Sequence, residues 1–238
     1  MNSRRDLVEK PKKSRRRRLM VWLLIDLVVA AAVISLLLYK PAQYHPVVAA
    51  AGADPNGHRV HTYVSHELMP ELYNGAQDRR PFEMTVLDPR LNEALAQARW
   101  RQTSGAITLS APAIAFQPGR VILMGTADIE GAKFIVTIEI GPQMTEEGQL
   151  NLLVKKVKVG AMNITPLARI MARRSYREQV ETGLIDTADW RTKIVASLLN
   201  EEPFEPVFPV EDKWVRLTGF EITAGQLTAR LVQVPKSL

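Results

Sequence analysis

The chain has 238 residues, and it contains no cysteine and no histidine after His66. Without cysteine, disulfides, thiolate nucleophiles and cysteine-ligated zinc or iron–sulfur sites are excluded. Without a later histidine, Ser-His catalysis in the rest of the chain is excluded as well. No G-x-S-x-G elbow surrounds any serine, and no glycine-rich phosphate loop occurs. We therefore expect a protein that is not an enzyme and that holds no metal or cofactor.

The excess of positive charge belongs to one end of the chain. The net charge is +6, but residues 1–18 hold nine of the 31 lysines and arginines against two acidic residues. The remainder has 22 basic and 23 acidic residues, so it is close to neutral. A near-neutral domain has no overall attraction for a phosphate backbone, and we expect no nucleic-acid partner.

One long apolar run stands directly after this basic tail. Residues 19–38 read LMVWLLIDLVVAAAVISLLL, and as an α-helix of 20 residues they span about the 30 Å of a bilayer core. Asp26 costs about 2.5 to 3.5 kcal/mol near the helix centre, whereas the 13 Leu, Ile and Val residues together contribute about −4 to −8 kcal/mol. The sequence therefore predicts a single transmembrane helix at residues 19–38.

The flanking charges predict the orientation of this helix. KPKKSRRRR precedes it and only Lys40 follows it closely, so the positive-inside rule places residues 1–18 in the cytoplasm. Small residues at 47–53 offer the alternative of a cleaved signal peptide. The apolar regions of signal peptides span roughly 7 to 15 residues, which this run exceeds. We expect a signal anchor retained in the cell membrane, with residues 39–238 outside the cytoplasm.

Asp26 and Ser35 are the polar residues of the apolar run. One interpretation is a protonated or solvated carboxyl that the surrounding side chains tolerate. The other is a polar contact of Asp26 and Ser35 with a second transmembrane helix, whose close approach the small residues Ala30 and Ala31 would allow. The sequence leaves both interpretations open.

Residues 39–81 contain repeated proline and glycine with little apolar periodicity, and they predict a partly mobile linker with one short helix near Ser65–Tyr73. A metal site needs ligands at fixed geometry, which a proline-rich loop does not provide, so we expect no metal in this linker. All four histidines of the chain fall within it: His45, His58, His61 and His66.

Residues 82–238 carry strand and helix patterns that together predict an α+β domain, with one curved antiparallel sheet packed against two or three helices. Phe82–Leu87 predicts a strand, and Asp88 as N-cap followed by Pro89 predicts a helix. The further strands expected are 107–109, 113–116, 121–128, 133–140 and 149–159, and then 213–222 and 226–234.

The strand at 149–159 changes phase along its length. Leu150, Leu152 and Val154 share one face, but Val157 and Val159 continue with the opposite parity. One extra residue in a strand produces such a change, so we expect a β-bulge near residues 155 and 156.

The helix expected at residues 165–180 combines an apolar side with a row of arginines, and a second helix is expected at 187–199. We expect Leu167, Ile170 and Met171 to face the core. The arginines form either a solvated outer face or a contact with anionic lipid headgroups through bidentate hydrogen bonds. They are Arg169, Arg173 and Arg177, at spacings of four, with Arg174 beside them.

Carboxylates keep one catalytic alternative open. A pair of them at the right separation serves a glycosidase-like hydrolase. On strands and loops such residues are most often solvated, so this alternative is the weaker one. The candidates are Glu139, Glu146, Glu147, Asp186 and Asp189.

The apolar anchor, the helix DPRLNEAL, the sheet region at 119–159 and the segment VKVGAMNITPLARIMARR resemble the YpmS-like bacterial envelope proteins, whose function is unknown, and more loosely the tubular lipid-binding superfamily. The resemblance implies that one face of the sheet lines an apolar groove for an acyl chain. The alternative is an ordinary core, which would leave no cavity of several hundred Å³. The candidate groove residues are Phe134, Val136, Ile138, Leu150, Leu152 and Val154.

Taken together, these features favour a single-pass envelope protein whose outer domain binds a lipid or another membrane protein without catalysis. The first alternative is an interaction module that acts through a sheet edge or the transmembrane helix. The second is the carboxylate-based hydrolase.

Overall fold

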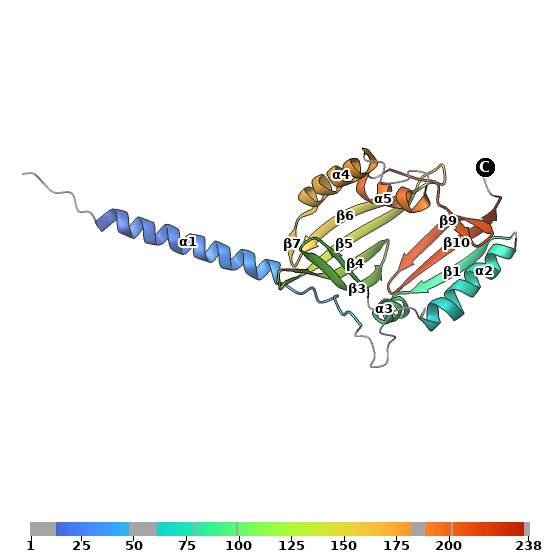
Figure 1. The fold of residues 1–238 in the computed structure, drawn as a ribbon, viewed down its shortest axis with the longest axis horizontal. Helices are drawn as coiled ribbons and strands as arrows, with labels where there is room; N and C mark the ends of the chain where they lie inside the picture. Colours follow the sequence, from blue (N-terminus) through green and yellow to red (C-terminus); the bar gives the residue numbers. More distant parts are fainter. Residues whose placement is uncertain are drawn as a thin grey trace, which may run out of the picture.

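The computed structural model describes residues 13–47, 61–78, 80–98, 100–181, 189–200 and 202–235. The tail before residue 13, residues 48–53 of the alternative cleavage segment, His58 and Asp186 lie outside the described residues. The described chain has the α+β class expected from the sequence, with an N-terminal apolar helix followed by a domain of sheets and helices (Figure 1).

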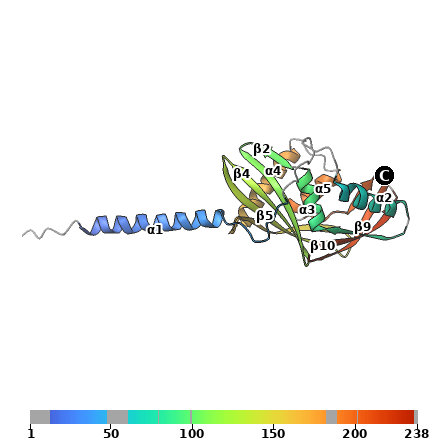
Figure 2. The ribbon, with the colours of Figure 1, turned by 90° about the horizontal axis from the view of Figure 1, so that it is seen from below.

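Helix α1 (Lys13–Leu37) extends away from the domain in both views (Figures 1 and 2). Its segment Arg17–Leu37 is long and apolar enough to cross a membrane, and the rest of the described chain buries none of it. Asp26 and Ser35 are both exposed on this helix. The expected apolar helix is therefore confirmed as a helix with uncovered apolar side chains.

The described residues of the domain form two antiparallel sheets, so the expectation of a single sheet is wrong. The sheets touch where Gly119 N–H donates to the Ile222 carbonyl and Gly225 N–H donates to the Phe116 carbonyl, each at 3.1 Å. The six-stranded sheet runs β2 (Arg101–Ser104), β3 (Ile107–Gln117), β4 (Arg120–Ile129), β5 (Ala132–Met144), β6 (Leu150–Val159) and β7 (Met162–Asn163). The four-stranded sheet runs β1 (Phe82–Leu87), β10 (Gln226–Val234), β9 (Lys213–Thr223) and β8 (Val207–Val210).

Five further helices cover these sheets. The π-helix η1 (Tyr63–Leu68) continues into α2 (Met69–Gln77), and α2 packs on the four-stranded sheet. Helix α3 (Asp88–Gln97) lies against β1 and β3, whereas α4 (Thr165–Glu181) and α5 (Trp190–Asn200) pack on β6. The core under α2 consists of Ala76, Val210, Val215, Ala229 and Leu231.

The packed part of the described chain begins before residue 82, so parts of the segment expected as a linker at 39–81 belong to the folded domain. Tyr44 is 2% exposed and packs on Ala113, Ile122 and Met124 of the six-stranded sheet. Its hydroxyl donates to the Ala111 carbonyl at 2.8 Å, and burial raises the pKa of this phenol. Tyr63 and Ala76 are buried as well: the Tyr63 hydroxyl accepts from Leu87 N–H at 3.0 Å, and Ala76 packs in the core under α2.

The predicted β-bulge is confirmed in β6. Glu139 of β5 pairs with Lys156, but Ile140, the next residue, pairs with Val154, so Lys155 has no partner across the ladder. The extra residue keeps Val154 and Val157 on the same face of the sheet.

Side chains of helix α3 form hydrogen bonds with the backbone of β3 where β2 does not pair with it. Leu87 is its N-cap, and Asp88, expected as N-cap, is instead the first helical residue, whose carboxylate accepts from Phe116 N–H at 2.9 Å. One turn later, Asn92 Nδ2 donates to the Ile114 carbonyl at 2.8 Å and Asn92 Oδ1 accepts from Ile114 N–H at 2.7 Å. The segment DPRLNEAL thus pairs with the strand beyond the end of β2.

We expect Asn92→Ala to lower the free energy of unfolding by about 1 to 3 kcal/mol, because the Ile114 N–H and carbonyl lose their partners. Urea titration of the full chain in detergent micelles, followed by circular dichroism, measures the change. The control is Glu93→Ala on the exposed side of α3, where only a 3.9 Å ion pair with Arg90 is lost. Equal stability of the two variants would show that the Asn92 hydrogen bonds do not stabilise the fold.

Candidate functional site

The face of the six-stranded sheet that α3, α4 and α5 cover is called the inner face below. Cross-strand pairs place apolar side chains together on it: Leu123 lies opposite Ile138, and Ile138 lies opposite Val157. The next pair along the sheet is Ile140 and Val154. Because directly paired residues share a face, these side chains form one apolar surface.

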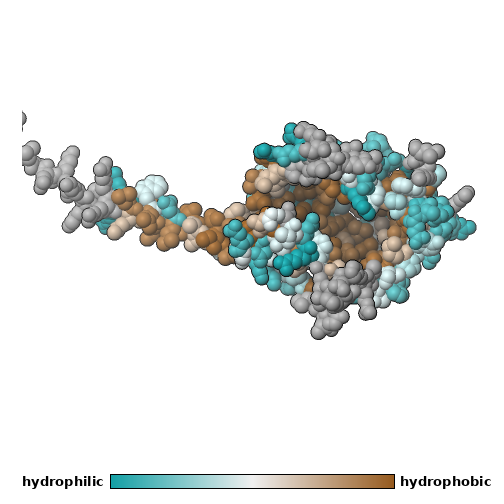
Figure 3. All heavy atoms as spheres, viewed as in Figure 1, coloured by the Kyte–Doolittle hydropathy of each residue, from teal (hydrophilic) through white to brown (hydrophobic). Residues whose placement is uncertain are grey.

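Two adjoining cavities open on this surface, and together they are called the inner groove. One, of about 270 Å³, lies between the sheet and α3, and the other, of about 240 Å³, lies between the sheet and the pair α4 and α5. Both are lined by Leu123 and Ile138, so they meet at these two side chains. Figure 3 shows apolar residues gathered in the hollowed middle of the domain. Among the described residues, Arg169 is the one charged residue in the lining of the inner groove.

The structure brings half of the predicted groove residues to the inner groove. Val136, Ile138 and Val154 line it. Phe134, Leu150 and Leu152 lie on the same strands, but none of the three lines either cavity. Leu150 is 7% exposed and exchanges two backbone hydrogen bonds with Phe204, so it belongs to packed structure.

Several groove residues lie in expected strands and helices but were not among the residues predicted to line a groove. Leu123 lies in the continuous apolar run Val121–Met124, where no alternation tells one face from the other. Ala168 and Ala172 are spaced by four and therefore share one face of the helix. This spacing of small residues could have identified the face that packs closely on the sheet. The remaining lining residues are Leu95, Trp100, Leu109, Pro112, Ala113, Ile114, Met124, Gly125, Ile140, Val157, Leu198 and Leu199.

Helix α4 buries the opposite face from the one that the sequence predicted. Leu167, Ile170 and Met171, expected to face the core, are 57%, 68% and 63% exposed. Ala168 and Ala172 instead face the groove, because side chains this small let the helix backbone approach the sheet closely. The result is an exposed apolar patch of Leu167, Ile170 and Met171, called the α4 patch below.

The four arginines of α4 do not form one solvated row. Arg169 donates to the Val154 carbonyl at 2.8 Å, and Arg173 Nε donates to the Leu199 carbonyl at the end of α5 at 3.4 Å. Arg174 pairs with Glu178 at 2.9 Å, and Arg177 is exposed. Arg169 and Arg173 therefore fix α4 to β6 and α5, whereas Arg174 and Arg177 remain candidates for a headgroup contact.

The edge of β6 is covered along most of its length. Phe204 bridges to Leu150, the Ser197 hydroxyl accepts from Leu152 N–H at 2.8 Å, and Arg169 bonds the Val154 carbonyl. The Thr165 hydroxyl accepts from Val157 N–H at 2.8 Å. Because these backbone groups have partners, this edge is a poor surface for strand addition.

The candidate catalytic and metal-binding residues are dispersed. Glu139 lies within β5, whereas Glu146 and Glu147 are exposed on the turn between β5 and β6, and Asp189 precedes α5. His61 Nδ1 accepts from Tyr63 N–H at 3.1 Å. Among the residues that the structure describes, no group of three or more His, Asp or Glu side chains is placed to hold a metal ion.

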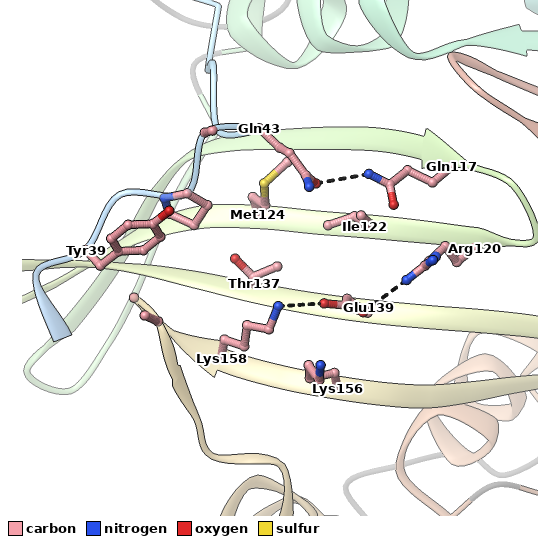
Figure 4. A pocket seen from close by; sticks show the side chains of 14 residues that line it. Tyr39, Gln43, Gln117, Arg120, Ile122, Met124, Thr137, Glu139, Lys156 and Lys158 are labelled. Carbon is pink, nitrogen blue, oxygen red and sulfur yellow. Dashed lines mark hydrogen bonds and ion pairs between the residues drawn. The ribbon is translucent and has the colours of Figure 1, made fainter. Parts of the chain in front are cut away.

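A third cavity lies on the opposite, outer face of the six-stranded sheet, beneath residues 39–43 (Figure 4). This outer pocket has a volume of about 520 Å³. Lys158 Nζ donates to Glu139 Oε1 at 2.8 Å, and Arg120 lies 3.6 Å from Glu139 Oε2. Gln117 Nε2 donates to Gln43 Oε1 at 3.2 Å and so ties the covering segment to β3.

Glu139 has an altered acidity in this pocket. Burial alone would raise its pKa, but the hydrogen bond from Lys158 and the positive charges of Lys158, Lys156 and Arg120 outweigh it and hold the pKa below its ordinary value. The folded-state pKa thus lies below the unfolded-state value of about 4.3. Ionised Glu139 stabilises the fold above that value, and this contribution is lost as the pH falls through the lowered folded-state pKa.

We expect Glu139→Gln to lower the free energy of unfolding at pH 7 by about 1.5 to 3 kcal/mol, because charge-assisted hydrogen bonds are lost. The difference from wild type should narrow as the pH falls below about 4. Urea titrations of the full chain in micelles at both pH values measure this. Glu146→Gln, on an exposed turn, is the control, and a pH-independent difference for Glu139→Gln would contradict the assignment.

In comparisons with protein-family models, with curated proteins and with solved structures, nothing matches this chain.

Proposed function

We propose that this chain is a single-pass membrane protein whose extracytoplasmic domain binds a lipid acyl chain in the inner groove, without catalysis. Helix α1 crosses the bilayer with the basic tail in the cytoplasm, in accordance with its length and flanking charges. The observation that carries the proposal is the open inner groove. We also propose that the chain is related to the YpmS-like envelope proteins that its sequence resembles.

The size and chemistry of the groove support an acyl chain as the occupant. Each cavity is slightly below the range of roughly 300 to 1,000 Å³ that small-molecule sites occupy, and an acyl chain that lies across both would have a volume within that range. A packed core would leave almost no such space. Apart from Arg169 at one side, the described residues of the lining carry no charge, so an unbranched hydrocarbon suits this lining better than a polar metabolite does.

The position of the α4 patch supports a membrane as the source of that chain. Ala161 N–H donates to the Leu36 carbonyl at 2.8 Å, so the start of α4 lies next to the end of α1. Met171 lies six residues after Thr165, the first residue of α4, and a rise of about 1.5 Å per helical residue places it about 9 Å along the axis from the start of that helix. Figure 1 shows α4 starting on the side of the domain that α1 enters. An exposed apolar patch at this height suits contact with a bilayer surface.

The test uses the full chain in nanodiscs with a fatty acid that carries a photoreactive diazirine at its tail. Cross-links should map to peptides of β4, β5 and α4, which line the inner groove. Lipid around α1 is the built-in comparison, since any membrane helix gives cross-links within residues 17–37. If cross-links are confined to α1, the groove does not hold acyl chains.

The anchor itself is tested by alkaline carbonate extraction and by protease added from outside. The full chain should stay in the membrane fraction, and residues after 38 should be digested in intact cells. Release by carbonate, or protection of the domain, would contradict the proposed topology.

A second candidate is an interaction module that docks an apolar segment of another membrane protein on the α4 patch. The exposure of Leu167, Ile170 and Met171 favours it. Cross-linking from residue 170 to a protein rather than to lipid would support this alternative over the first.

A further inference from the structure

The outer pocket holds more positive than negative charge. Arg120, Lys156 and Lys158 face it together with one carboxylate, that of Glu139. Lys156 lies directly across the ladder from Glu139, and Lys158 lies directly across from Thr137, so all of these side chains share the outer face. Like charges on one face of a sheet repel one another. Three positive groups against one carboxylate leave a net charge of +2, which a bound anion would neutralise.

A buried hydroxyl in the same pocket has no partner. Thr137 is 6% exposed and lines the outer pocket, and its Oγ1 has no hydrogen-bond partner within the described part of the chain. A buried donor without an acceptor costs free energy, which an oxyanion in the pocket would offset by accepting the Thr137 proton. Figure 4 shows Thr137 on the neighbouring strand to Lys158, in the middle of the lining.

We propose that the outer pocket binds one phosphate group, either free in solution or on the headgroup of an anionic lipid. A phosphate dianion matches the two surplus charges, and guanidinium and ammonium groups donate strong charge-assisted hydrogen bonds to its oxygens. This site lies on the opposite face of the sheet from the inner groove, and phosphate binding there does not depend on the acyl-chain proposal.

The place of the pocket in the fold makes both sources reachable. Tyr39, Gly160 and Ala161 are part of its wall, and Ala161 is bonded to the last turn of α1. When α1 spans a bilayer, this wall stands at headgroup height. The volume of about 520 Å³ exceeds what a phosphate alone requires and leaves room for the glycerol of a lipid headgroup.

Lys156→Gln and Lys155→Gln form a matched pair for the test. Both remove one positive charge from adjacent positions of β6, but Lys156 lines the pocket whereas Lys155 is the exposed bulge residue. Thr137→Val is the second test variant, because it removes the unpartnered hydroxyl and keeps the shape of the side chain. Glu139 keeps its contacts with Arg120 and Lys158 in all three variants.

The first arm titrates inorganic phosphate into the full chain in phosphatidylcholine nanodiscs, by isothermal calorimetry. We expect Lys156→Gln and Thr137→Val each to weaken phosphate binding about tenfold or more, and Lys155→Gln to leave it unchanged. The second arm repeats the titration in nanodiscs that contain phosphatidylglycerol. Loss of phosphate binding there identifies the headgroup as the occupant, and unchanged binding identifies free phosphate.

The proposal is overturned if wild type binds no phosphate in the first arm and if, by thermal unfolding in the nanodiscs of the second arm, phosphatidylglycerol raises the Tm of wild type no more than that of Lys156→Gln. It is also overturned if Lys156→Gln and Lys155→Gln behave alike in both arms, because the surplus charge would then act only through the surface as a whole. Since Thr137→Val changes no charge, its weaker binding separates a built site from general electrostatic attraction.

Discussion

Leu123→Trp is expected to reduce acyl-chain occupancy of the inner groove at least tenfold. Leu123 lines both cavities, so an indole at this position fills the point where they join. Each buried methylene contributes about 0.8 kcal/mol, so the exclusion of only two of them removes about 1.6 kcal/mol, slightly more than a tenfold change. The yield of diazirine cross-links to β5 in nanodiscs measures the change.

The variant should fold, because the ring enters open space and not a filled core, and overpacking costs arise only in the latter. Leu87→Trp is the matched control, since Leu87 is 38% exposed at the end of β1 in the other sheet. Cross-link yields in β5 that are equal for Leu123→Trp and Leu87→Trp would show that the acyl chain does not lie in the inner groove.

Gly160→Val is expected to detach the end of α1 from the domain. Gly160 has a φ of +58°, and a Cβ there would overlap the carbonyl oxygens of Leu36 and Leu37. The left-handed conformation costs a residue with a side chain about 1 to 2 kcal/mol, and the overlap with backbone adds to it. We expect amide hydrogen exchange at Ala161, whose N–H bonds Leu36, to become at least tenfold faster.

Gly105→Val separates the two causes. Gly105 has nearly the same φ, +57°, but nothing lies within 4 Å of a Cβ placed there. The backbone strain is therefore matched while the overlap with α1 is absent. If Gly105→Val and Gly160→Val leave Ala161 equally protected, the junction of α1 and the domain is not the contact that Gly160 permits.

Local patterns in the sequence were sufficient for much of the six-stranded sheet. The hairpin of β4 and β5 follows from the alternation of Phe134, Val136 and Ile138, and the change of phase after Val154 located the bulge at Lys155. These features depend on residues close together in the chain. The apolar helix at residues 17–37 was predictable for the same reason, because its signal is length and composition alone.

The division into two sheets had no such local signal. Strand β1 pairs with β10, so Phe82 meets Leu231 from the far end of the chain. The pairing depends on burial around Ala76, whose helix falls in a segment rich in proline and glycine that predicted a linker. The hydrogen bonds of the Asn92 side chain with Ile114 of β3 could not be predicted from the sequence either, since an asparagine inside a helix more often faces water.

The sequence predicted part of the inner groove but not the outer pocket. Val136, Ile138 and Val154 were found because strand alternation predicts which side chains share a face. The orientation of α4 was predicted wrongly, because its large apolar side chains were taken as the buried side and Ala168 and Ala172 were not. The outer pocket was missed because Lys156 and Lys158 are brought together with Arg120 by strand pairing and by the covering segment at 39–43, neither of which has a local sequence signal.

The bond between Leu36 and Ala161 gives α1 a second attachment to the domain besides the peptide chain. A second attachment restricts rotation of the domain about the axis of α1. A helix that tilts in a thinner bilayer would then lean the whole domain with it and lower one rim of the inner groove toward the lipid. Membrane thickness would in this way govern how readily an acyl chain passes between the bilayer and the protein.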